Sequence, residues 1–469
     1  MEGAFYMKRI LFLILFSLCF TVSCNNNSGS GRGDSLSEED VKKEDDVVTK
    51  DTQSKEKLNL YGDSEFVSVS NKILSGEKVS SGNNYYISAN AASEGNGSQT
   101  SPFKTFKNAL SKLSAGDTLY VMAGTYYEQI KLTSKQKGSA VSYITIAAAE
   151  SNIPPIISGQ KASNNFILMT INGASFVRIS GLTFKDSNGL DAAGIYIEPP
   201  SNHIIIDNCS FTNIKVPDPA TRDHVANGIL CFGERADASI NNLLFYKNSF
   251  TDMATGWGEC VSVVANCEFV NIIKNTIDKT GNIGIDVGGN YGYCSKPSVD
   301  FARYVYIAEN TVKNCESAYG DTAYGIYADG GQHIQIINNT VEHCSGGIEV
   351  GAEEPQKSEA YATLDVLVQK NKVSFSDECA LAIGGYDKDL GLVRSVKVIQ
   401  NVFTDNADKD DGAIIALSKC DKVIIQENNF TQSNGKYKGE VLYKALDGKY
   451  TTNLTINNNT YKGLDSADE

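Results

Sequence analysis

The chain has 469 residues, of which 42 are lysine or arginine and 56 are aspartate or glutamate, so its formal net charge is −14. This balance argues against nucleic acid or an anionic membrane surface as a partner, because both would repel an acidic protein. It also counts against a bare polyanionic substrate, unless a divalent cation bridges protein and substrate.

The first 23 residues have the organisation of a signal peptide. Lys8 and Arg9 precede an apolar run over 10–20, which is shorter than the roughly 20 residues of a membrane-spanning helix. Small residues then lead to Cys24, and this junction resembles the lipobox of bacterial lipoproteins, whose cysteine is acylated and becomes the mature N-terminus. The resemblance implies export and a lipid anchor in the cell envelope, at the outer membrane or the cell surface; simple cleavage and release is the alternative.

Residues 24–83 are predicted to form a disordered tether. The stretch from Asn25 to Glu56 is rich in Asn, Ser and Gly and then in charged residues, with almost no large apolar side chain to bury. No second linker follows, so residues 84–469 are predicted to form one domain. Ordinary globular cores stop growing at about 250–300 residues, and an uninterrupted body of this length therefore indicates a solenoid.

The body is predicted to open with a strand, a turn and a short helix. The apolar run that begins at Asn84 is typical of a strand, the segment 101–110 of an amphipathic helix, and the segment 115–121 of a second strand that ends in a turn at Gly124.

A short unit of asparagine, one variable residue and an apolar or aromatic residue then recurs every 27 to 35 residues. The units begin at Asn248, Asn275, Asn310, Asn339, Asn371, Asn401, Asn428 and Asn459. Cys209 takes the same place in an earlier copy. Apolar or alternating runs precede most units and indicate short strands. Each repeat is predicted to be one coil, with asparagine at a bend, where it tolerates the left-handed conformation and bonds its own backbone or a stacked neighbour.

Together, this opening and the repeats resemble secreted bacterial right-handed parallel β-helix proteins of the pectate-lyase-like superfamily, over roughly residues 84 to 462. The resemblance implies an all-β fold, a right-handed parallel β-helix whose short N-terminal helix caps the open end. It also implies a polysaccharide or oligosaccharide substrate that lies along an outer strand face. The protein is expected to be a monomer that contacts the membrane only through its lipid anchor.

Nine cysteines lie in the body, and none forms a C-x-x-C pair. Cys315 and Cys344 end matching strings, so they are expected to stack in neighbouring coils as buried free thiols, with a disulfide as the alternative. The four histidines have no ligand spacing, so no zinc site is predicted.

Three consecutive coils each carry a run that begins with glycine and contains an acid. Alternation sends the aliphatic residues of these runs inward and Asp286, Asp329 and Glu349 outward from neighbouring rungs. Strand geometry places Asp286 and Asp329, and likewise Asp329 and Glu349, about 8 Å apart at the backbone, and Asp286 and Glu349 roughly 10 Å apart. Carboxylates ~6.5–9.5 Å apart suit inverting glycoside hydrolysis.

Glycines around these acids remove side chains and leave room for a sugar ring. Tyrosines in this region, Tyr291 among them, suit stacking on sugar faces. The residues predicted to bind substrate are Tyr327, Tyr386, Asp387, Glu353 and Glu259.

Three functions remain open. In a glycoside hydrolase, Asp286, Asp329 and Glu349 would act as acid, base and transition-state stabiliser, with the individual roles unassigned and no cofactor. In a calcium-dependent polysaccharide lyase, the same acids would bind Ca²⁺ and a lysine or arginine would stand close by; the metal question stays open. A glycan-binding or adhesin solenoid needs no catalytic group, and the concentration of acids and glycines between Asn275 and Asn401 favours an enzyme over it.

Overall fold

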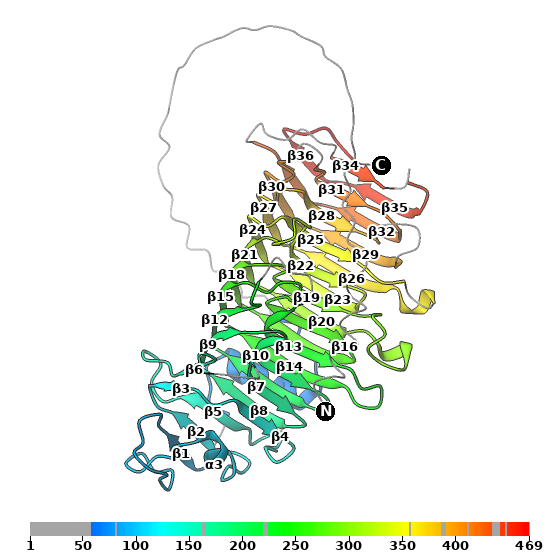
Figure 1. Ribbon diagram of the computed structural model, residues 1–469. Helices are drawn as coiled ribbons and strands as arrows, with labels where there is room; N and C mark the ends of the chain where they lie inside the picture. Colours follow the sequence, from blue (N-terminus) through cyan, green and yellow to red (C-terminus); the bar gives the residue numbers. More distant parts are fainter. Residues whose placement is uncertain are drawn as a thin grey trace, which may run out of the picture. The chain divides into compact units, whose positions relative to one another are not determined.

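The computed structural model describes residues 58–79, 82–161, 166–218, 224–355, 358–385, 391–409, 412–433, 441–445 and 448–468. Most of the strands belong to three long parallel sheets that wind together as a right-handed β-helix (Figure 1). The predicted fold class is confirmed. Within a coil the chain passes from the first sheet to the third, then to the second, and so into the next coil.

The first sheet has 13 strands: β1 (Asn84–Ile87), β2 (Thr118–Val121), β5 (Ile144–Ala148), β8 (Ser175–Ser180), β11 (Asn202–Asp207), β14 (Ile240–Tyr246), β17 (Cys267–Ile273), β20 (Arg303–Ala308), β23 (Gln332–Ile337), β26 (Thr363–Gln369), β29 (Val393–Ile399), β32 (Cys420–Gln426) and β35 (Thr451–Asn457). The second has 11: β4 (Ile130–Thr133), β7 (Ile167–Asn172), β10 (Ala192–Glu198), β13 (Ala226–Gly233), β16 (Val261–Ala265), β19 (Ile285–Gly288), β22 (Tyr324–Asp329), β25 (Gly346–Gly351), β28 (Cys379–Ile383), β31 (Ile415–Leu417) and β34 (Leu442–Lys444). The third has 12: β3 (Thr125–Tyr126), β6 (Ile156–Ser158), β9 (Thr183–Asn188), β12 (Ser210–Lys215), β15 (Ser249–Met253), β18 (Thr276–Thr280), β21 (Thr311–Cys315), β24 (Thr340–Glu342), β27 (Lys372–Ser374), β30 (Val402–Thr404), β33 (Asn429–Thr431) and β36 (Thr460–Lys462).

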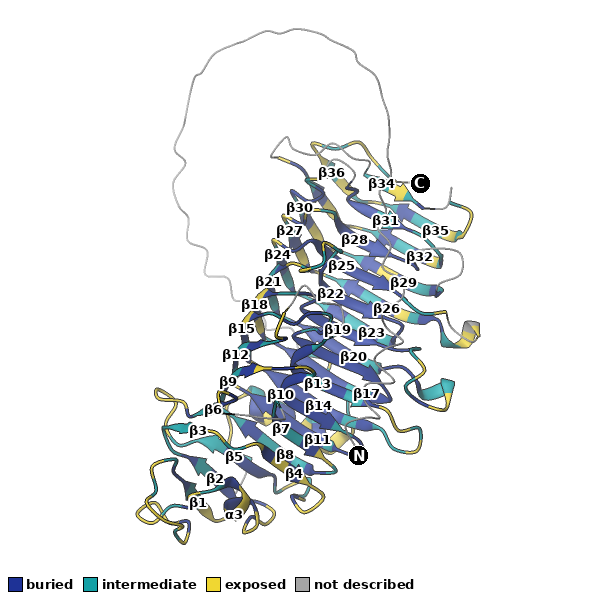
Figure 2. Cartoon of the chain, viewed as in Figure 1, coloured by how far each residue is buried: buried dark blue, intermediate teal, exposed yellow. Residues whose placement is uncertain are grey.

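The core is the interior of the coils, where aliphatic side chains from the three sheets meet. Figure 2 shows long buried stretches along the strands and exposed connecting loops. Aromatic residues of the repeats stack from coil to coil: the rings of Phe184 and Phe211 are 5.1 Å apart, and those of Phe211 and Phe250 are 4.7 Å apart. The repeat in the sequence therefore corresponds to a stack of equivalent inward-facing positions in successive coils.

The asparagines form a continuous ladder of hydrogen bonds between coils. The backbone N–H of Asn310 donates to Oδ1 of Asn339 at 2.9 Å, and Asn339 donates in the same way to Asn371 at 2.8 Å. The left-handed backbone conformation belongs to the residue before each asparagine, such as Lys274 with φ 56°. The predicted bend is thus present, but asparagine supplies the side-chain bond and its neighbour supplies the positive φ.

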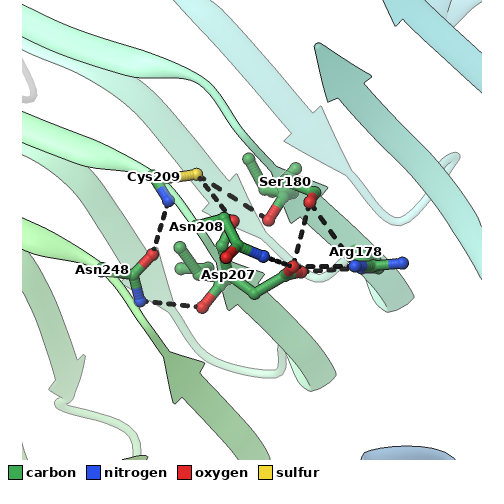
Figure 3. Close-up of polar contacts among 8 residues, drawn as sticks. Arg178, Ser180, Asp207, Asn208, Cys209 and Asn248 are labelled. Atoms are coloured by element: carbon green, nitrogen blue, oxygen red, sulfur yellow. Dashed lines mark hydrogen bonds and ion pairs between the residues drawn. The ribbon is translucent and has the colours of Figure 1, made fainter. Parts of the chain in front are cut away.

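Cys209 stands at the first rung of this ladder, as its place in the repeat predicts (Figure 3). Its backbone N–H donates to Oδ1 of Asn248 at 3.0 Å. Nearby, Arg178 binds both carboxylate oxygens of Asp207 at 2.7 Å. This ion pair joins β8 to β11 on the outer side of the first sheet.

The predicted capping helix is α3 (Phe106–Leu110), whose Phe106, Ala109 and Leu110 are buried in the core. The prediction of a disordered tether up to residue 83 is wrong for α2 (Ser64–Leu74), which Asp63 caps by accepting from the Phe66 N–H at 2.8 Å. Phe66 is fully buried. The sequence between 58 and 74 does contain enough apolar residues to pack, so composition alone placed the boundary too late. The signal peptide, Cys24 and residues 25–57 lie outside the described residues.

All nine cysteines of the body are free and buried in the described structure, so the predicted free thiols are confirmed. The short 3₁₀ helices η1 (Pro297–Val299) and η2 (Glu359–Tyr361) lie in loops after β19 and β25. Within the described ranges, no helix has the length and apolar character needed to cross a membrane.

Candidate functional site

The predicted acids lie on the outer side of the second sheet, in three neighbouring strands. β19, β22 and β25 pair so that Asp286 lies beside Tyr327, and Tyr327 lies beside Glu349. Asp329 follows two residues after Tyr327. Between them, Ala328 is fully buried in the core. The alternation and the order of rungs that the sequence predicts are therefore present.

These outward side chains are nevertheless enclosed. Asp286, Asp329 and Glu349 expose only 6%, 2% and 1% of their surfaces. An open strand face, which the sequence analysis expected, would leave such side chains accessible. Their burial means that other parts of the chain cover this face, and that the charged forms of these acids are destabilised.

The loop between β19 and β20 is one of the segments that cover this face of the second sheet. Gly288, the last residue of β19, pairs with Gly330 in an antiparallel bridge. The amide of Asn290 then donates to the carbonyl of Gly330 at 3.2 Å and to that of Tyr361 at 3.1 Å. This side chain therefore holds the β19–β20 loop to the β25–β26 loop.

Tyr291, from the same loop, joins two of the acids. Its hydroxyl donates to a carboxylate oxygen of Asp329, and it lies 3.3 Å from Oε2 of Glu353. The backbone N–H of Glu353 donates to the other oxygen of Asp329 at 2.9 Å. Asp329 is thus held by two donors from two different loops.

The four carboxylates of Glu259, Asp286, Asp329 and Glu353 form one electrostatic cluster, called here the acid cluster. Burial raises the pKa of Asp286 well above its usual value, and the neighbouring charges of Glu259, Asp329 and Glu353 raise it further. Burial also raises the pKa of Asp329, but only to about 6, because the Tyr291 hydroxyl and the Glu353 N–H stabilise its charged form. Oδ1 of Asp286 is buried and has no hydrogen-bond partner among the described residues.

Glu259 and Glu353 are the more accessible members of the acid cluster. Burial and the charge of Asp329 together raise the pKa of Glu259 to about 7 and that of Glu353 to about 8. The Asn227 amide donates to the Glu259 backbone carbonyl at 2.9 Å. Both residues were predicted as substrate contacts, and the structure brings them to the same group as Asp286 and Asp329.

Glu349, the third of the acids predicted as catalytic, stands two rungs from Asp286. In the register of the sheet, Tyr327 stands between Asp286 and Glu349. A Cβ atom on Gly351 would lie 2.8 Å from Oε1 of Glu349 and 2.9 Å from the Tyr327 hydroxyl. These two side chains therefore both reach the space that glycine leaves open at position 351.

The structure leaves two of the predicted substrate-binding residues undescribed and gives a predicted stacking residue a different contact. Tyr386 and Asp387 lie outside the described residues. Tyr291, which the sequence suggests as a surface for stacking, instead places its hydroxyl between two acids. The sequence signal that could have indicated this contact is the position of Tyr291 directly after the Gly288-Gly289-Asn290 turn, which can fold back over the sheet.

The acid cluster is suited to proton transfer. Among the described residues, no ion pair joins these four carboxylates to a lysine or arginine, and no three His, Cys, Asp or Glu side chains are arranged to hold a metal ion. Since several buried carboxylates that repel one another cannot all be charged, they must share protons at neutral pH. Acids with different pKa values in one site are suited to act as an acid and a base.

Comparison with known families supports the fold over most of the chain. The family described as "Pel9A-like, right handed beta helix region" matches residues 85–256. A second family, described as "Right handed beta helix region", matches residues 324–467. A relative from Bacillus subtilis (strain 168), the uncharacterized protein YwoF, is 30% identical over 396 residues, which are 81% of this chain and 80% of the relative.

Solved structures share the architecture at low sequence identity. The GH136 lacto-N-biosidase from Eubacterium ramulus superposes with a TM-score of 0.59 at 14% identity, covering 86% of this chain and 71% of that one. A structure described as a glycoside hydrolase has a TM-score of 0.53 at 9% identity, covering 83% of this chain and 97% of that one. At these identities the similarity shows a shared fold.

Proposed function

This chain belongs to the family of right-handed β-helix proteins that includes YwoF of Bacillus subtilis, and on that premise we propose that it is a glycoside hydrolase that cleaves polysaccharide or oligosaccharide. The observation that carries the proposal is the acid cluster on the outer side of the second sheet, with its graded pKa values. The resemblance of fold to a lacto-N-biosidase and to another glycoside hydrolase is consistent with it, although a fold alone does not fix an activity.

The environments of the two most buried members of the acid cluster suggest their roles. Asp286 has a strongly raised pKa and an oxygen without a protein partner, so it is suited to protonate the leaving glycosidic oxygen. Asp329, with a pKa of about 6, is ionised at neutral pH and is suited to activate water. Their diagonal positions on adjacent rungs correspond to about 8 Å at the backbone, which favours inversion over retention.

The remaining acids support this pair. Glu259 and Glu353 are partly exposed at the edge of the acid cluster and are the proposed contacts to sugar hydroxyls. Glu349 reaches the same space as the Tyr327 hydroxyl and is the proposed positioning residue for that side chain. Tyr291 holds Asp329 and Glu353 in place.

The N-terminal region would place this activity at the cell envelope. We propose that Cys24 carries a lipid anchor after export and that the segment between it and α2 serves as a tether. In this arrangement the protein acts as a monomer and touches the membrane only through its lipid.

The test is to incubate the full chain with plant, algal and host polysaccharides, with calcium and with chelator, and to record reducing ends and unsaturated uronates together. Asp329→Asn is the test variant, and Asp252→Asn is the matched control, because the Asp252 side chain is 66% exposed on β15. Reducing ends without unsaturated products, insensitive to chelator and lost only in Asp329→Asn, would support the hydrolase. A calcium-dependent unsaturated product would replace it with a lyase, and binding without cleavage would replace it with a glycan-binding solenoid.

A further inference from the structure

A hollow of about 280 Å³ lies at the N-terminal end of the first sheet, away from the acid cluster. Its lining includes Asn84, Tyr86, Gln99, Tyr120, Met122 and Glu150. In the order of the sheet, β8, β11, β14 and β17 separate β5 from β20, the strand that follows the acid-bearing β19. Five strand spacings amount to about 24 Å, so the hollow and the acid cluster are separate places on the solenoid. Figure 1 shows β1 and β2 near one end of the solenoid and β19 and β22 near its middle.

Two tyrosines form the floor of this hollow. Tyr86 lies beside Tyr120 in the register of β1 and β2, and their rings stack with centroids 5.3 Å apart and an interplanar angle of 27°. The next residue in register is Ala147, followed by Ser180. The stack therefore ends at Tyr120, because a methyl group is too short to cover the ring.

The end of this stack distinguishes it from the aromatic ladder of the core. There, Phe211 has a ring on each side, at 5.1 Å and 4.7 Å, and is fully buried. Tyr86 and Tyr120 are both partly exposed. An exposed aromatic face beside a small residue is a surface on which an apolar ring can pack.

Polar groups surround this surface. Asn84 and Gln99 are exposed and bring amide donors and acceptors, and Glu150 is exposed and brings a carboxylate. An aromatic floor with a few polar groups is the usual composition of a small-ligand site. A pyranose ring fits this combination, since its C–H face packs on an aromatic ring while its hydroxyls bond to amides. Glu150 is the one charged side chain among the described lining residues, and it would repel an anionic sugar.

We propose that this hollow is a second saccharide-binding site, which takes one or two rings of a neutral glycan. The choice of a glycan as ligand rests on the proposed function, whereas the site itself rests on the geometry of the hollow. Its volume is just below the roughly 300–1,000 Å³ of common ligand pockets, which suits one or two rings. A site about 24 Å from the acid cluster holds a polymer near the enzyme and raises its local concentration at the catalytic site.

The experiment measures binding and cleavage separately in the full chain. Titration calorimetry follows neutral xylo-, cello- and N-acetyllactosamine oligosaccharides, with oligogalacturonate as the anionic comparison. Tyr120→Ala is the test variant and Tyr120→Phe keeps the ring. Tyr450→Ala is the matched control, because Tyr450 is 39% exposed in the C-terminal coils. Circular dichroism checks that each variant is folded.

We expect Tyr120→Ala to weaken binding of a neutral oligosaccharide by about 3- to 10-fold, with Tyr120→Phe and Tyr450→Ala close to the unchanged protein. Cleavage of short substrates should be unaffected by Tyr120→Ala. Equal binding in folded Tyr120→Ala and the unchanged protein, stronger binding of the anionic sugar, or no binding of any neutral glycan would overturn the proposal. If Tyr120→Ala weakens binding but nothing is cleaved, the second site stands and the hydrolase fails; the reverse pattern leaves the hydrolase and removes the second site.

Discussion

Replacement of Tyr291 by phenylalanine removes one hydroxyl from the acid cluster and keeps the ring. That hydroxyl donates to Asp329 and lies 3.3 Å from Glu353, and both contacts lower the pKa of the carboxyl involved. A hydrogen bond to a charged group contributes about 1.5–3 kcal/mol, and about 1.4 kcal/mol corresponds to one pKa unit. Tyr291→Phe should therefore raise the pKa of Asp329 by about one to two units.

The sign of the effect on activity follows from the proposed role of Asp329 as the base. A base acts in its ionised form, so the acidic limb of the kcat/KM profile should move towards higher pH by the same one to two units, as expected for a lost charge-stabilising bond of about 1.5–3 kcal/mol. The assay is the pH dependence of hydrolysis for the unchanged chain, Tyr291→Phe and the control Tyr361→Phe, whose ring packs against Phe301 at 6.3 Å. An unmoved acidic limb with a lower plateau would show that Tyr291 acts only on substrate binding, and would refute the electrostatic argument.

Three further predictions concern the stability of the protein and the proposed catalytic acid, Asp286. The folded-state pKa values of Asp329, Glu259 and Glu353 are raised to about 6, 7 and 8, so their contribution to stability is present at acidic pH and is lost as pH rises from about 4 to 8. The melting temperature should fall across this window by a few degrees, and it should fall less in Glu353→Gln. A melting temperature that does not change with pH would contradict this prediction. Asp286→Asn should lower hydrolysis by about 100-fold or more while the melting temperature stays about equal, since the amide has the size of the acid and, like the protonated acid proposed there, carries no charge; loss of both would point to misfolding. Asn339→Ala, which leaves partners of the ladder unsatisfied, should cost about 2–4 kcal/mol in urea unfolding, against a small change for the exposed Asn429→Ala.

The sequence predicted the solenoid well because one local rule is repeated in every coil. The asparagine unit, the inward aliphatic residues and the stacked Phe211 each occupy the same position in successive turns, so periodicity alone gives the path of the chain. The order of Asp286, Asp329 and Glu349 on adjacent rungs followed from the same rule. The end of the tether could not be predicted from this rule, because α2 is a single element outside the repeat. Its burial depends on contacts with distant coils, such as the contact of Asp63 with His203 at 2.8 Å.

The composition of the acid cluster could be predicted only in part, for a related reason. Alternation tells which side of a strand a residue occupies, and this placed Asp286 and Asp329 outward. It does not tell what a loop places over that side. Glu353 and Tyr291 reach the acids from two loops whose lengths differ from coil to coil, and no periodic signal encodes their approach.

The loops are also what distinguishes the two central acids. Without the loops that cover these strands, Asp286 and Asp329 would face solvent equally, and both would have a pKa near the usual value of an aspartate. The β19–β20 and β25–β26 loops enclose both, which raises both pKa values, but they deliver donors from Tyr291 and the Glu353 backbone to Asp329 alone. The pKa of Asp286 is therefore raised well above its usual value, whereas that of Asp329 is raised only to about 6. The regular coils set the spacing of the pair, and the irregular loops supply the difference in proton affinity on which the proposed acid–base cleavage depends.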